Sequence, residues 1–496
     1  MEEIIQYFAE VCINSFIEEQ KKFFERPHEF ADFEKGITEV VSGLGREFIR
    51  ITLEEINAAF RNSQRRKDKW YIEDTDKKQL ITTLGTVVFK KTLFRSKTEF
   101  TEDGKEVMCY LLDKALGFTE NQRMTEGAAE RIYEEAVQTS YRKGGEAVSS
   151  EDKVSKQAVK ELLHKTNFPP NFQIPELKKE VEYLYIDADE DHYSLQFQNH
   201  KGDIELDERG HKKNGAITKI IYVYEGVEPE APKSRRNRLI NTHYFCRGDG
   251  DNKALWDEVY AYIEAHYDIT KIKQIYLNSD GGSWIKAGYK RIAGIRYVLD
   301  EFHLSKYILK MTGHMLDSQF DARDKLCRII RRGSKEEFQK EIENLKEYTE
   351  KETTKEKIQC AADYVLGNWG AAKKRLWKKD GVLACSAEGH VYHVLSSRMS
   401  TQAMGWSRHG ASQMAHLREY YYNGGNMLEL ARYQKTELPK AAGAEELELS
   451  AYDILKTETG ERTKYNREVG KYADILNHTL SLQSRKKAQF NIHKYL

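Results

Sequence analysis

The stretch YLYIDADEDHYSLQ, residues 183–196, constrains the fold of this chain more than any other. An apolar run ends at the carboxylate Asp187, further acidic or polar residues follow, and a second β-prone run begins at Tyr193. The pattern predicts a hairpin of two strands, with an acid at the end of the first strand. Taken alone, these acids are more typical of a solvated hairpin turn than of a functional site.

Two more carboxylates downstream occupy similar positions. Asp280 follows an apolar strand pattern in KQIYLNSDGGSW, and Glu388 opens a helical pattern in LACSAEGHVYHVLSSRM. Three acids at the ends of strands or helices are what a two-metal phosphodiester site requires, because Mg²⁺ prefers oxygen ligands. We therefore expect Asp187, Asp280 and Glu388 to act as catalytic metal ligands for Mg²⁺ or Mn²⁺, with two ions in the site.

Composition sets the outer bounds. The 496 residues suffice for several domains, and the 79 basic and 79 acidic residues cancel, so any nucleic-acid-binding surface must be local. The six cysteines are scattered without a CxxC spacing, which predicts reduced thiols in a cytoplasmic protein. The sequence contains no apolar run of membrane-spanning length, and its start, MEEIIQYF, lacks a basic region and a cleavage site. We expect no membrane partner.

The N-terminal part divides by texture into four regions. Residues 1–68 carry an apolar stripe at helical spacing, which predicts helices with a core or self-association face. Residues 69–118 are rich in β-branched and aromatic side chains, as in LITTLGTVVFKKTLFR at 80–95, and predict a small antiparallel sheet. Residues 119–170 are helical again, and the proline-containing stretch 171–182 predicts a linker.

The helices of 119–170 have the order of a helix-turn-helix. A short helix at 141–147 is followed by the serine-rich turn AVSSED and a helix carrying lysines. Such a second helix can enter a DNA major groove, with Lys153, Lys156, Lys160 and Lys165 contacting phosphates. Three packed helices with a solvated lysine face have similar sequences, so both interpretations stay open.

After the linker, residues 183–312 predict strands at 183–187, 193–198, 217–224 and 239–246, then alternating helices and strands. A helix is expected at 252–266, strands at 272–278 and 295–299, and helices from 283 and 301. Three meandering strands followed by alternating helix and strand are typical of a ribonuclease-H-like fold, in which the first strand is central. Asp187 and Asp280 would then converge. The expected class is α/β, multidomain.

Residues 313–383 interrupt this region with charged helical patterns, and residues 384–432 close it. An inserted helical domain needs its two ends close together, and we expect a compact bundle over the acidic site. The segment AAKKRLWKK, 371–379, should turn a group of basic side chains towards DNA: Lys373, Lys374, Arg375, Lys378 and Lys379. A solvated helix end is equally common. Residues 433–496 are a polar tail with a basic end.

The three acids and the helical insertion resemble the DDE transposases, and more narrowly the insertion-sequence transposases of the ISLre-type family, which is related to the mutator-like branch. The similarity covers nearly the whole chain. Its most specific motifs are NSDGGSWI, DEFHLSK and the closing AEGHVYHVLSSRMSTQAMGWSRHGASQMAHLR, taken together with IDADEDH. A single Asp on a strand would carry no such information.

The resemblance adds further site residues. In DEFHLSK, residues 300–306, it implies that Asp300 is a metal ligand and that His303 orients a phosphate or a metal-bound water. A capping or packing role for His303 is the alternative. In the closing segment, Arg398 and Arg408 are expected to line a DNA groove with His409 and Arg418, while Trp406 is more typical of a core residue than of a base-stacking platform.

The implied function is a transposase that hydrolyses a phosphodiester and transfers the strand at terminal inverted repeats. Its partners would be double-stranded DNA, both terminal repeats and target, and other copies of the chain in a homo-oligomer. One alternative is a catalytically idle, transposase-derived DNA-binding protein, which the presence of all three acids disfavours. Another is a carboxylate-pair glycoside hydrolase, which needs only two acids and leaves the strand order unexplained.

Overall fold

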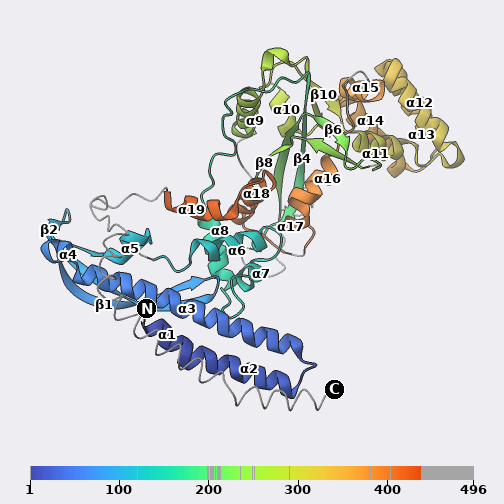
Figure 1. Cartoon of the computed structure of the whole chain (residues 1–496). Coiled ribbons are helices and arrows are strands. Elements are labelled where there is room, and N and C mark those ends of the chain that lie inside the picture. The colour runs from blue at the N-terminus through green and yellow to red at the C-terminus, as the bar shows by residue number, and fades with distance from the viewer. Residues whose placement is uncertain are drawn as a thin grey trace. The chain divides into compact units, whose positions relative to one another are not determined.

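The computed structural model describes residues 2–436, apart from positions 120, 198–199, 201–205, 207, 209–213, 235, 249, 251, 290, 379–380 and 403. The chain forms two compact units. The first contains the chain up to Leu162 and the segment from Met427, and the second spans Leu163–Asn426. Figure 1 labels helices and strands of both units. The predicted tail lies outside the described residues from position 437 on.

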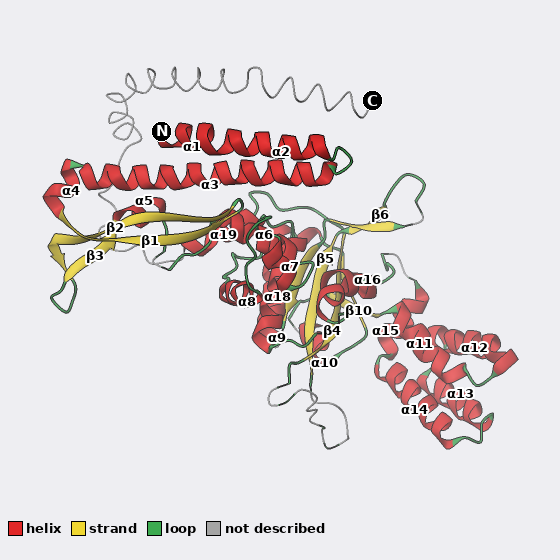
Figure 2. Cartoon of the chain, turned by 90° about the horizontal axis from the view of Figure 1, so that it is seen from below, coloured by secondary structure: helices red, strands yellow, loops and turns green. Residues whose placement is uncertain are grey.

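The first unit combines long helices with a three-stranded antiparallel sheet in the order β1-β2-β3. Helix α3 runs beside α2 and along the ribbon of β1 and β2 (Figure 2). Its helices and strands are α1 (Glu2–Tyr7), a π-helical turn (Phe8–Cys12), α2 (Ile13–Glu25), α3 (Phe30–Asn62), α4 (Gln64–Lys69), β1 (Trp70–Thr82), β2 (Gly85–Phe100), β3 (Glu106–Tyr110), α5 (Leu111–Leu116), α6 (Glu126–Ala136), α7 (Tyr141–Glu146) and α19 (Met427–Thr436). Helix α8 (Lys156–Lys165) continues into the second unit.

The sheet of the first unit contains a tight hairpin and a buried charge group. Gly85, expected inside one extended run, instead opens β2 opposite Thr82, with a φ of 113° that favours glycine. Behind the ribbon, Asp113 Oδ2 accepts hydrogen bonds from Lys78 Nζ at 3.1 Å and Lys91 Nζ at 2.5 Å. All three side chains are about 93% buried, because each is 7% exposed. Two ammonium groups thus share one carboxylate.

The second unit is built on a five-stranded mixed sheet of order β10-β9-β4-β5-β8. Strand β4 is central, antiparallel to β5 and parallel to β9; β5 and β8 are antiparallel, and β9 and β10 are parallel. The elements are β4 (Tyr183–Ser194), β5 (Gly215–Tyr224), a small β6–β7 hairpin (Gly226–Pro229, Asn237–Ile240), β8 (His243–Arg247), α9 (Asn252–His266), β9 (Gln274–Ser279), α10 (Ser283–Tyr289), β10 (Ile295–Leu299) and α11 (Glu301–Thr312). The chain is an α/β protein.

Strand β4 corrects the predicted hairpin, because it continues unbroken to Ser194. A turn would expose the acidic residues, but they alternate with apolar residues along a strand that is buried on both faces. Ile186 and Ala188 pack into the core beneath α9 and α10, while Asp187 and Asp191 are buried on the opposite face. The acids therefore lie within the central strand.

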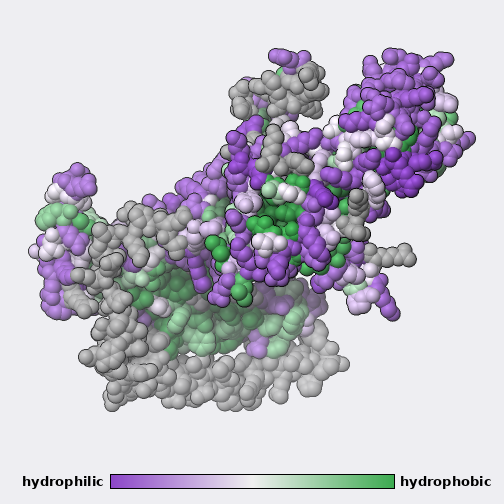
Figure 3. Space-filling model, turned by 90° about the horizontal axis from the view of Figure 1, so that it is seen from above, coloured by the Kyte–Doolittle hydropathy of each residue, from purple (hydrophilic) through white to green (hydrophobic). Residues whose placement is uncertain are grey.

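The interruption after α11 is helical, as the sequence predicts. It consists of α12 (Gln319–Arg332), α13 (Lys335–Glu347), α14 (Glu352–Gly367) and α15 (Trp369–Trp377), which share a hydrophobic core with α11. The outer surface of these helices is mainly hydrophilic (Figure 3, purple, upper right). Beyond it follow α16 (Ala387–Val391), a π-helical turn (Tyr392–Ser396), α17 (Ser397–Met399) and α18 (Arg408–Tyr422). Helix α16 packs on β4 and α18 on β8.

The structure bears on two features that the composition predicts, the absence of membrane-spanning segments and the state of the cysteines. None of the helices in the described part of the chain has the length and apolarity needed to cross a membrane. All six cysteines are free thiols, as their scattered spacing predicts.

Candidate functional site

The register of the parallel strands brings three carboxylates to one level. Asp187 on β4 stands opposite Asn278 on β9, so two residues further on Asp189 comes level with Asp280. Strand β10 runs beside β9 in the register that puts Asp300 level with Asp280, and Asp300 N donates to the β9 end. Adjacent strands lie about 4.8 Å apart, so these acids are neighbours across three strands.

Asp189, which the sequence analysis did not single out, has a raised pKa in this position. Burial raises its pKa, and repulsion from Asp280 and Asp300 raises it further, to about 7. The backbone N–H of Glu190, at 2.8 Å from Oδ1, and the nearby His303 act in the opposite direction. Like charges that share a poorly hydrated site disfavour ionisation of one another. The site therefore holds more negative charge than its own residues compensate.

Asp300 and His303 form a dyad at the start of α11. Asp300 is the N-cap residue: its Oδ1 accepts from Phe302 N at 3.3 Å and its Oδ2 from His303 N at 3.2 Å. The same Oδ2 lies 2.8 Å from His303 Nδ1. Burial opposes ionisation of Asp300, but its hydrogen bonds with His303 hold its pKa below the ordinary value. The hydrogen bond to Asp300 raises the pKa of His303. His303 is therefore held by the N-cap residue Asp300 and lies near the other acids.

Asp280 is fixed by the tight turn that follows β9. Its Oδ1 accepts from Gly282 N at 2.9 Å, and its carbonyl oxygen accepts from the Tyr364 hydroxyl of α14 at 2.5 Å. Gly281 between them has a φ of 88°, and a Cβ there would lie 2.5 Å from Tyr297 Oη. Only glycine fits this position without displacing Tyr297. The DGG turn thus fixes the position of the Asp280 carboxylate through the backbone N–H of Gly282.

The structure places Asp187 in the interior. It is fully buried, and its carboxylate accepts hydrogen bonds from Tyr222 Oη at 2.8 Å, Tyr224 Oη at 3.1 Å, Asn278 Nδ2 at 2.7 Å and Ser386 N at 3.3 Å. Burial raises its pKa, and these donors lower it. With its oxygens hydrogen-bonded and no exposed surface, Asp187 has a structural role beneath the site. Its predicted role as a catalytic metal ligand would require a metal to replace some of these hydrogen bonds, and it stays a prediction.

Arg375 is likewise part of the interior. It is only 3% exposed, and its guanidinium donates to Leu299 O at 2.8 Å, Leu383 O at 2.6 Å and Asn278 Oδ1 at 2.8 Å. Asn278 in turn donates to Asp187, so Arg375 supports the site through one amide. A side chain that is buried and held by these contacts cannot reach DNA, which corrects the predicted DNA contact. The same bond to Leu299 brings the end of the insertion back to β10.

Glu388 lies on the acid-bearing face of β4 but is exposed. It stands two residues after Ser386, whose N–H binds Asp187, near the start of α16. No hydrogen bond links Glu388 to the other acids among the described residues, whereas its neighbour His390 is bonded to Tyr244 Oη through Nδ1 at 2.7 Å. The helix is thus anchored, and the Glu388 carboxylate projects from an anchored element.

The donor set fits a hard cation by its chemistry. Within the described ranges, no three His, Cys, Asp or Glu side chains are close enough to hold a metal ion as they stand. Asp189, Asp280 and Asp300 nevertheless supply the carboxylate oxygens that Mg²⁺ prefers, and a cation would offset the negative charge that raises the pKa of Asp189. The residues that would hold Mg²⁺ are these three, with Glu388 on the facing helix.

The remaining predicted DNA contacts separate into exposed and buried residues. Lys153, Lys156, Lys160 and Lys165 are all exposed on or beside α8, and Lys378 is exposed after α15. Lys373 and Lys374 are half-buried and donate to the carbonyls of Gly333 and Tyr297, both at 3.4 Å. Lys379 lies outside the described residues.

The closing segment contributes less to a surface than its charges suggest. Arg408 and His409 are exposed. Arg398 is 1% exposed, lies over the Trp406 ring at 4.9 Å and contacts Met404, while Arg418 is fully buried. Arg398 and Arg418 therefore hold the closing helices together and cannot line a groove, which corrects their predicted role. Trp406 is a core residue, as its sequence setting favours.

Comparison with known proteins supplies the family. Residues 26–436 match the model of the Uncharacterised protein family (UPF0236). A UPF0236 protein of Caldanaerobacter subterraneus subsp. tengcongensis is 37% identical over 395 residues, 79% of this chain and 78% of the relative. A UPF0236 protein of Streptococcus gallolyticus, whose printed name places it in the vanSb 3′ region, is 26% identical over 406 residues, 78% of this chain and 81% of the relative. By the extent of these matches, the chain belongs to the UPF0236 family.

Proposed function

We propose that this protein is a DDE transposase, which performs metal-dependent phosphodiester hydrolysis and strand transfer at the terminal inverted repeats of an insertion sequence. One observation carries the proposal: Asp189 on β4 lies at the level of Asp280 and Asp300, the residues that directly follow β9 and β10, and burial together with these two acids raises the pKa of Asp189. Clustered, mutually repelling carboxylates are typical of a functional site, since a fold gains no stability from them.

The sheet supports a ribonuclease-H-like assignment for the second unit. Its central first strand, antiparallel second and third strands, and parallel fourth and fifth strands have the order expected of that fold. The helix-turn-helix is also part of the proposal. The segment that leads into α8 contacts α7, because Val154 N donates to Gly145 O at 3.0 Å, and Lys156 and Lys160 are exposed on α8. Double-stranded DNA is the proposed partner, and a homo-oligomer the proposed assembly.

Each residue of the site has a separate task. Asp189, Asp280 and Glu388 would hold Mg²⁺ or Mn²⁺, with Asp300 beside them. When bound, the cations supply charge stabilisation at phosphorus and an activated nucleophile. Asp300 holds His303 through Nδ1, which leaves Nε2 available to donate to a phosphate oxygen. Asp187, Asn278 and Arg375 fix the strand ends from below. The revised acidic set therefore replaces Asp187 with Asp189.

The relatives are consistent with a mobile element. The printed name of the 37% identical relative joins many loci of a single strain, and other relatives from that strain also carry names that join several loci. Many copies of one protein in a genome are what a transposing element leaves behind. This supports the transposase over a carboxylate-pair glycoside hydrolase, for which the structure offers no additional observation.

Cleavage of a defined DNA end tests the proposal. The substrate is a duplex taken from the DNA that flanks the reading frame, with its inverted repeat, incubated with the full chain and Mn²⁺ or Mg²⁺. The wild type should nick this duplex, and Asp189→Asn should lower the rate about 10³-fold, since the lost charge stabilisation is about 4 kcal/mol. Glu388→Gln should have a similar effect.

Asp187→Asn is the matched control, because it removes a carboxylate two residues away on the same strand face. It should lower the unfolding midpoint, whereas Asp189→Asn should not. Near-wild-type cleavage by Asp189→Asn would remove that residue from the site. Specific binding of the repeat by a wild type that never cleaves would identify an idle DNA-binding protein and defeat the enzyme assignment.

A further inference from the structure

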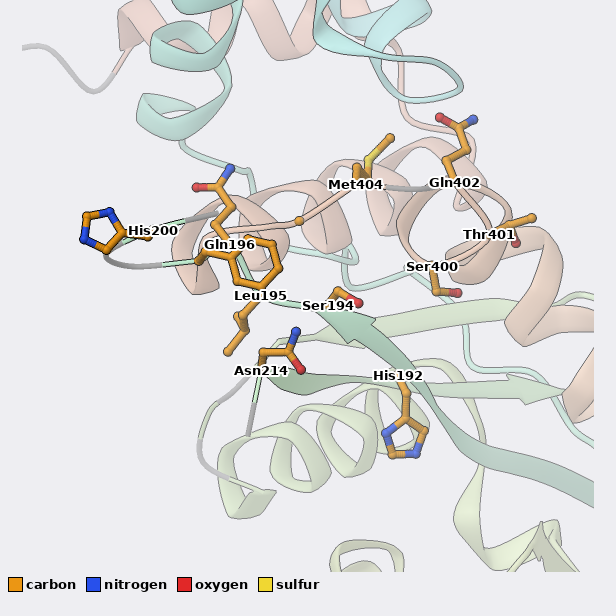
Figure 4. A pocket seen from close by; sticks show the side chains of 12 residues that line it. His192, Ser194, Leu195, Gln196, His200, Asn214, Ser400, Thr401, Gln402 and Met404 are labelled. Atoms are coloured by element: carbon orange, nitrogen blue, oxygen red, sulfur yellow. The ribbon is translucent and has the colours of Figure 1, made fainter. Parts of the chain in front are cut away.

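A cavity opens at the C-terminal end of β4, beyond the acidic residues of that strand. It has a volume of about 750 Å³, within the roughly 300–1,000 Å³ range of small-molecule sites. One wall is residues 194–197, where β4 ends. The facing wall is formed by residues 400–402 and 404–405 after α17, and Asn214 and His192 lie beside them (Figure 4). All of these residues belong to the second unit.

The two walls are tied together by backbone hydrogen bonds. Trp406 N donates to Ser194 O and Gln196 N donates to Trp406 O, both at 2.9 Å. Leu195 N donates to Asn214 O at 2.6 Å on the other side. A Cβ at Gly405 would lie 3.1 Å from Gln196 Cα, so this close approach is built around a glycine. The cavity is therefore framed by fixed backbone.

The lining is polar but carries no formal charge of its own. None of the 12 described lining residues is Lys, Arg, Asp or Glu. The amides of Gln196, Asn214 and Gln402 can both donate and accept, and Phe197 offers a partly exposed aromatic ring. His192 and His200 are the only described lining residues that could bind a phosphate or a metal ion through charge or coordination, and the remaining lining residues are neutral. A flat, neutral group with donors and acceptors along its edge matches this lining.

The hydroxyl of Ser400, which lines the cavity, is oriented by the buried Asp191. Asp191 is buried, and its Oδ1 accepts hydrogen bonds from Ser400 Oγ and Ser396 Oγ, both at 2.8 Å. A hydroxyl has a single hydrogen, so this bond commits Ser400 as a donor and leaves its lone pairs to accept from a ligand in the cavity. Ser400 thus presents a fixed acceptor for an N–H group.

We propose that this cavity binds a nucleobase that is turned out of the DNA end during the reaction. The inference rests on the proposed function for the identity of the DNA. Asp189 and Ser194 are separated by 194 − 189 = 5 residues of β4. At about 3.4 Å per residue the cavity lies roughly 17 Å from the acids, or about five base steps along a strand. The extruded base is therefore expected about five nucleotides from the cleaved phosphate.

Binding without cleavage provides the test. The full chain is titrated, with EDTA in place of divalent metal, onto terminal-repeat duplexes that carry one mismatch at successive positions. Unpairing costs a few kcal/mol and is easiest at a mismatch, so the mismatch near the fifth position should tighten binding about tenfold or more. An abasic nucleotide at the same position should not reproduce the gain, because it supplies no base to the cavity.

The variants and outcomes separate this site from the catalytic one. The double variant Asn214→Ala/Gln402→Ala should lose the mismatch gain, and Gln339→Ala, an exposed glutamine of α13, should retain it. A gain at no position, or a gain that persists in the double variant, overturns the proposal. A thermal shift with dAMP but no mismatch gain would assign the cavity to free nucleotides and overturn it too. A mismatch gain in a chain that never cleaves upholds the cavity and refutes the reaction.

Discussion

The two large sheets of this protein both bury ionisable groups, but with opposite balance. Behind the ribbon of the first unit, Lys78 and Lys91 share the carboxylate of Asp113, so unlike charges meet. On the central sheet of the second unit, Asp189 and Asp280 stand level, so like charges meet. Burial lowers the pKa of Lys78 and raises that of Asp189, which shows the same cost of dehydration in both places.

The difference separates a structural group from a functional one. A buried charge that has its counter-charge holds the fold in one arrangement, and removing the counter-charge is strongly destabilising. A buried charge that lacks one weakens the fold until a ligand compensates it. Neutralising Asp113 and neutralising Asp189 should therefore change the free energy of unfolding in opposite directions.

The largest effect on stability is expected at Asp113. Asp113→Asn keeps the shape of the side chain but leaves two buried ammonium groups without a carboxylate, which should lower the free energy of unfolding by about 3–5 kcal/mol. Urea unfolding of the full chain measures it, with the exposed Asp103→Asn of the β2–β3 loop as control. A loss below about 1 kcal/mol would mean that the lysines are neutral or hydrated, and the comparison between the sheets would fail.

Arg375 is a buried cation beside the sheet of the second unit, and its removal, like that of Asp113, should destabilise the protein. Arg375→Met leaves Leu299 O, Leu383 O and Asn278 Oδ1 without their donor, so the free energy of unfolding should fall by about 2–3 kcal/mol. The nearby exposed Lys378→Ala should change it by less than about 0.5 kcal/mol. If the two substitutions change the free energy of unfolding equally, Arg375 is not structural and the DNA contact predicted from the sequence stands again.

Asp189 should give the metal-free protein a pH-dependent weakness. Its pKa rises from 3.8 in the unfolded chain to about 7 in the folded one, so the folded state holds the extra proton between these values. Stability from this group is therefore lost as the pH rises through that window, by about 2 kcal/mol between pH 5 and pH 8. Thermal unfolding in EDTA measures the loss, which Asp189→Asn should abolish. Added Mg²⁺ should restore the lost stability above pH 7. If Asp189→Asn has the same pH profile as the wild type, the pH dependence does not come from Asp189 and the claim of like-charge crowding is wrong.

The smallest effect on stability is expected for the exposed lysines of α8. Lys156→Ala/Lys160→Ala should leave the free energy of unfolding within about 0.5 kcal/mol of the wild type. If both contact phosphates, the dependence of log affinity on log salt concentration should become shallower by about two units. Fluorescence anisotropy across a salt series measures the slope. A slope equal to that of the wild type would leave these lysines in solvent.

The local elements were largely predictable from the sequence because their periodicities are strong. Helix α9 and strand β10 have the predicted bounds, and β5 and β9 lie close to their predicted ranges, whereas the run predicted at 239–246 divides into β7 and β8, which belong to different sheets. The hairpin at 183–198 was not found, since Asp and Glu residues are normally read as a turn. Only pairing with β5 and β9 shows that these acids lie within a strand buried on both faces.

The site was half predictable. Strand ends and the DGG turn indicate Asp280, but the choice between Asp187 and Asp189 depends on the register with β9, which no local pattern encodes. The period of two along β4 was a usable signal, because it puts both acids on one face. Arg375 also carried a signal: it follows the buried Ala371 by four residues, on the apolar face of α15. Counting its charge with the neighbouring lysines hid that spacing.

The insertion leaves and re-enters the sheet at a single point. Strand β10 ends at Leu299, α11 begins at Glu301, and Arg375 at the end of the last inserted helix is hydrogen-bonded to Leu299 O. A segment whose entrance and exit coincide can be lengthened, shortened or exchanged without altering the order of the strands. The four inserted helices, which share a hydrophobic core with α11, are thus a structural module that can change in size without shifting the register of the strands that position the acids.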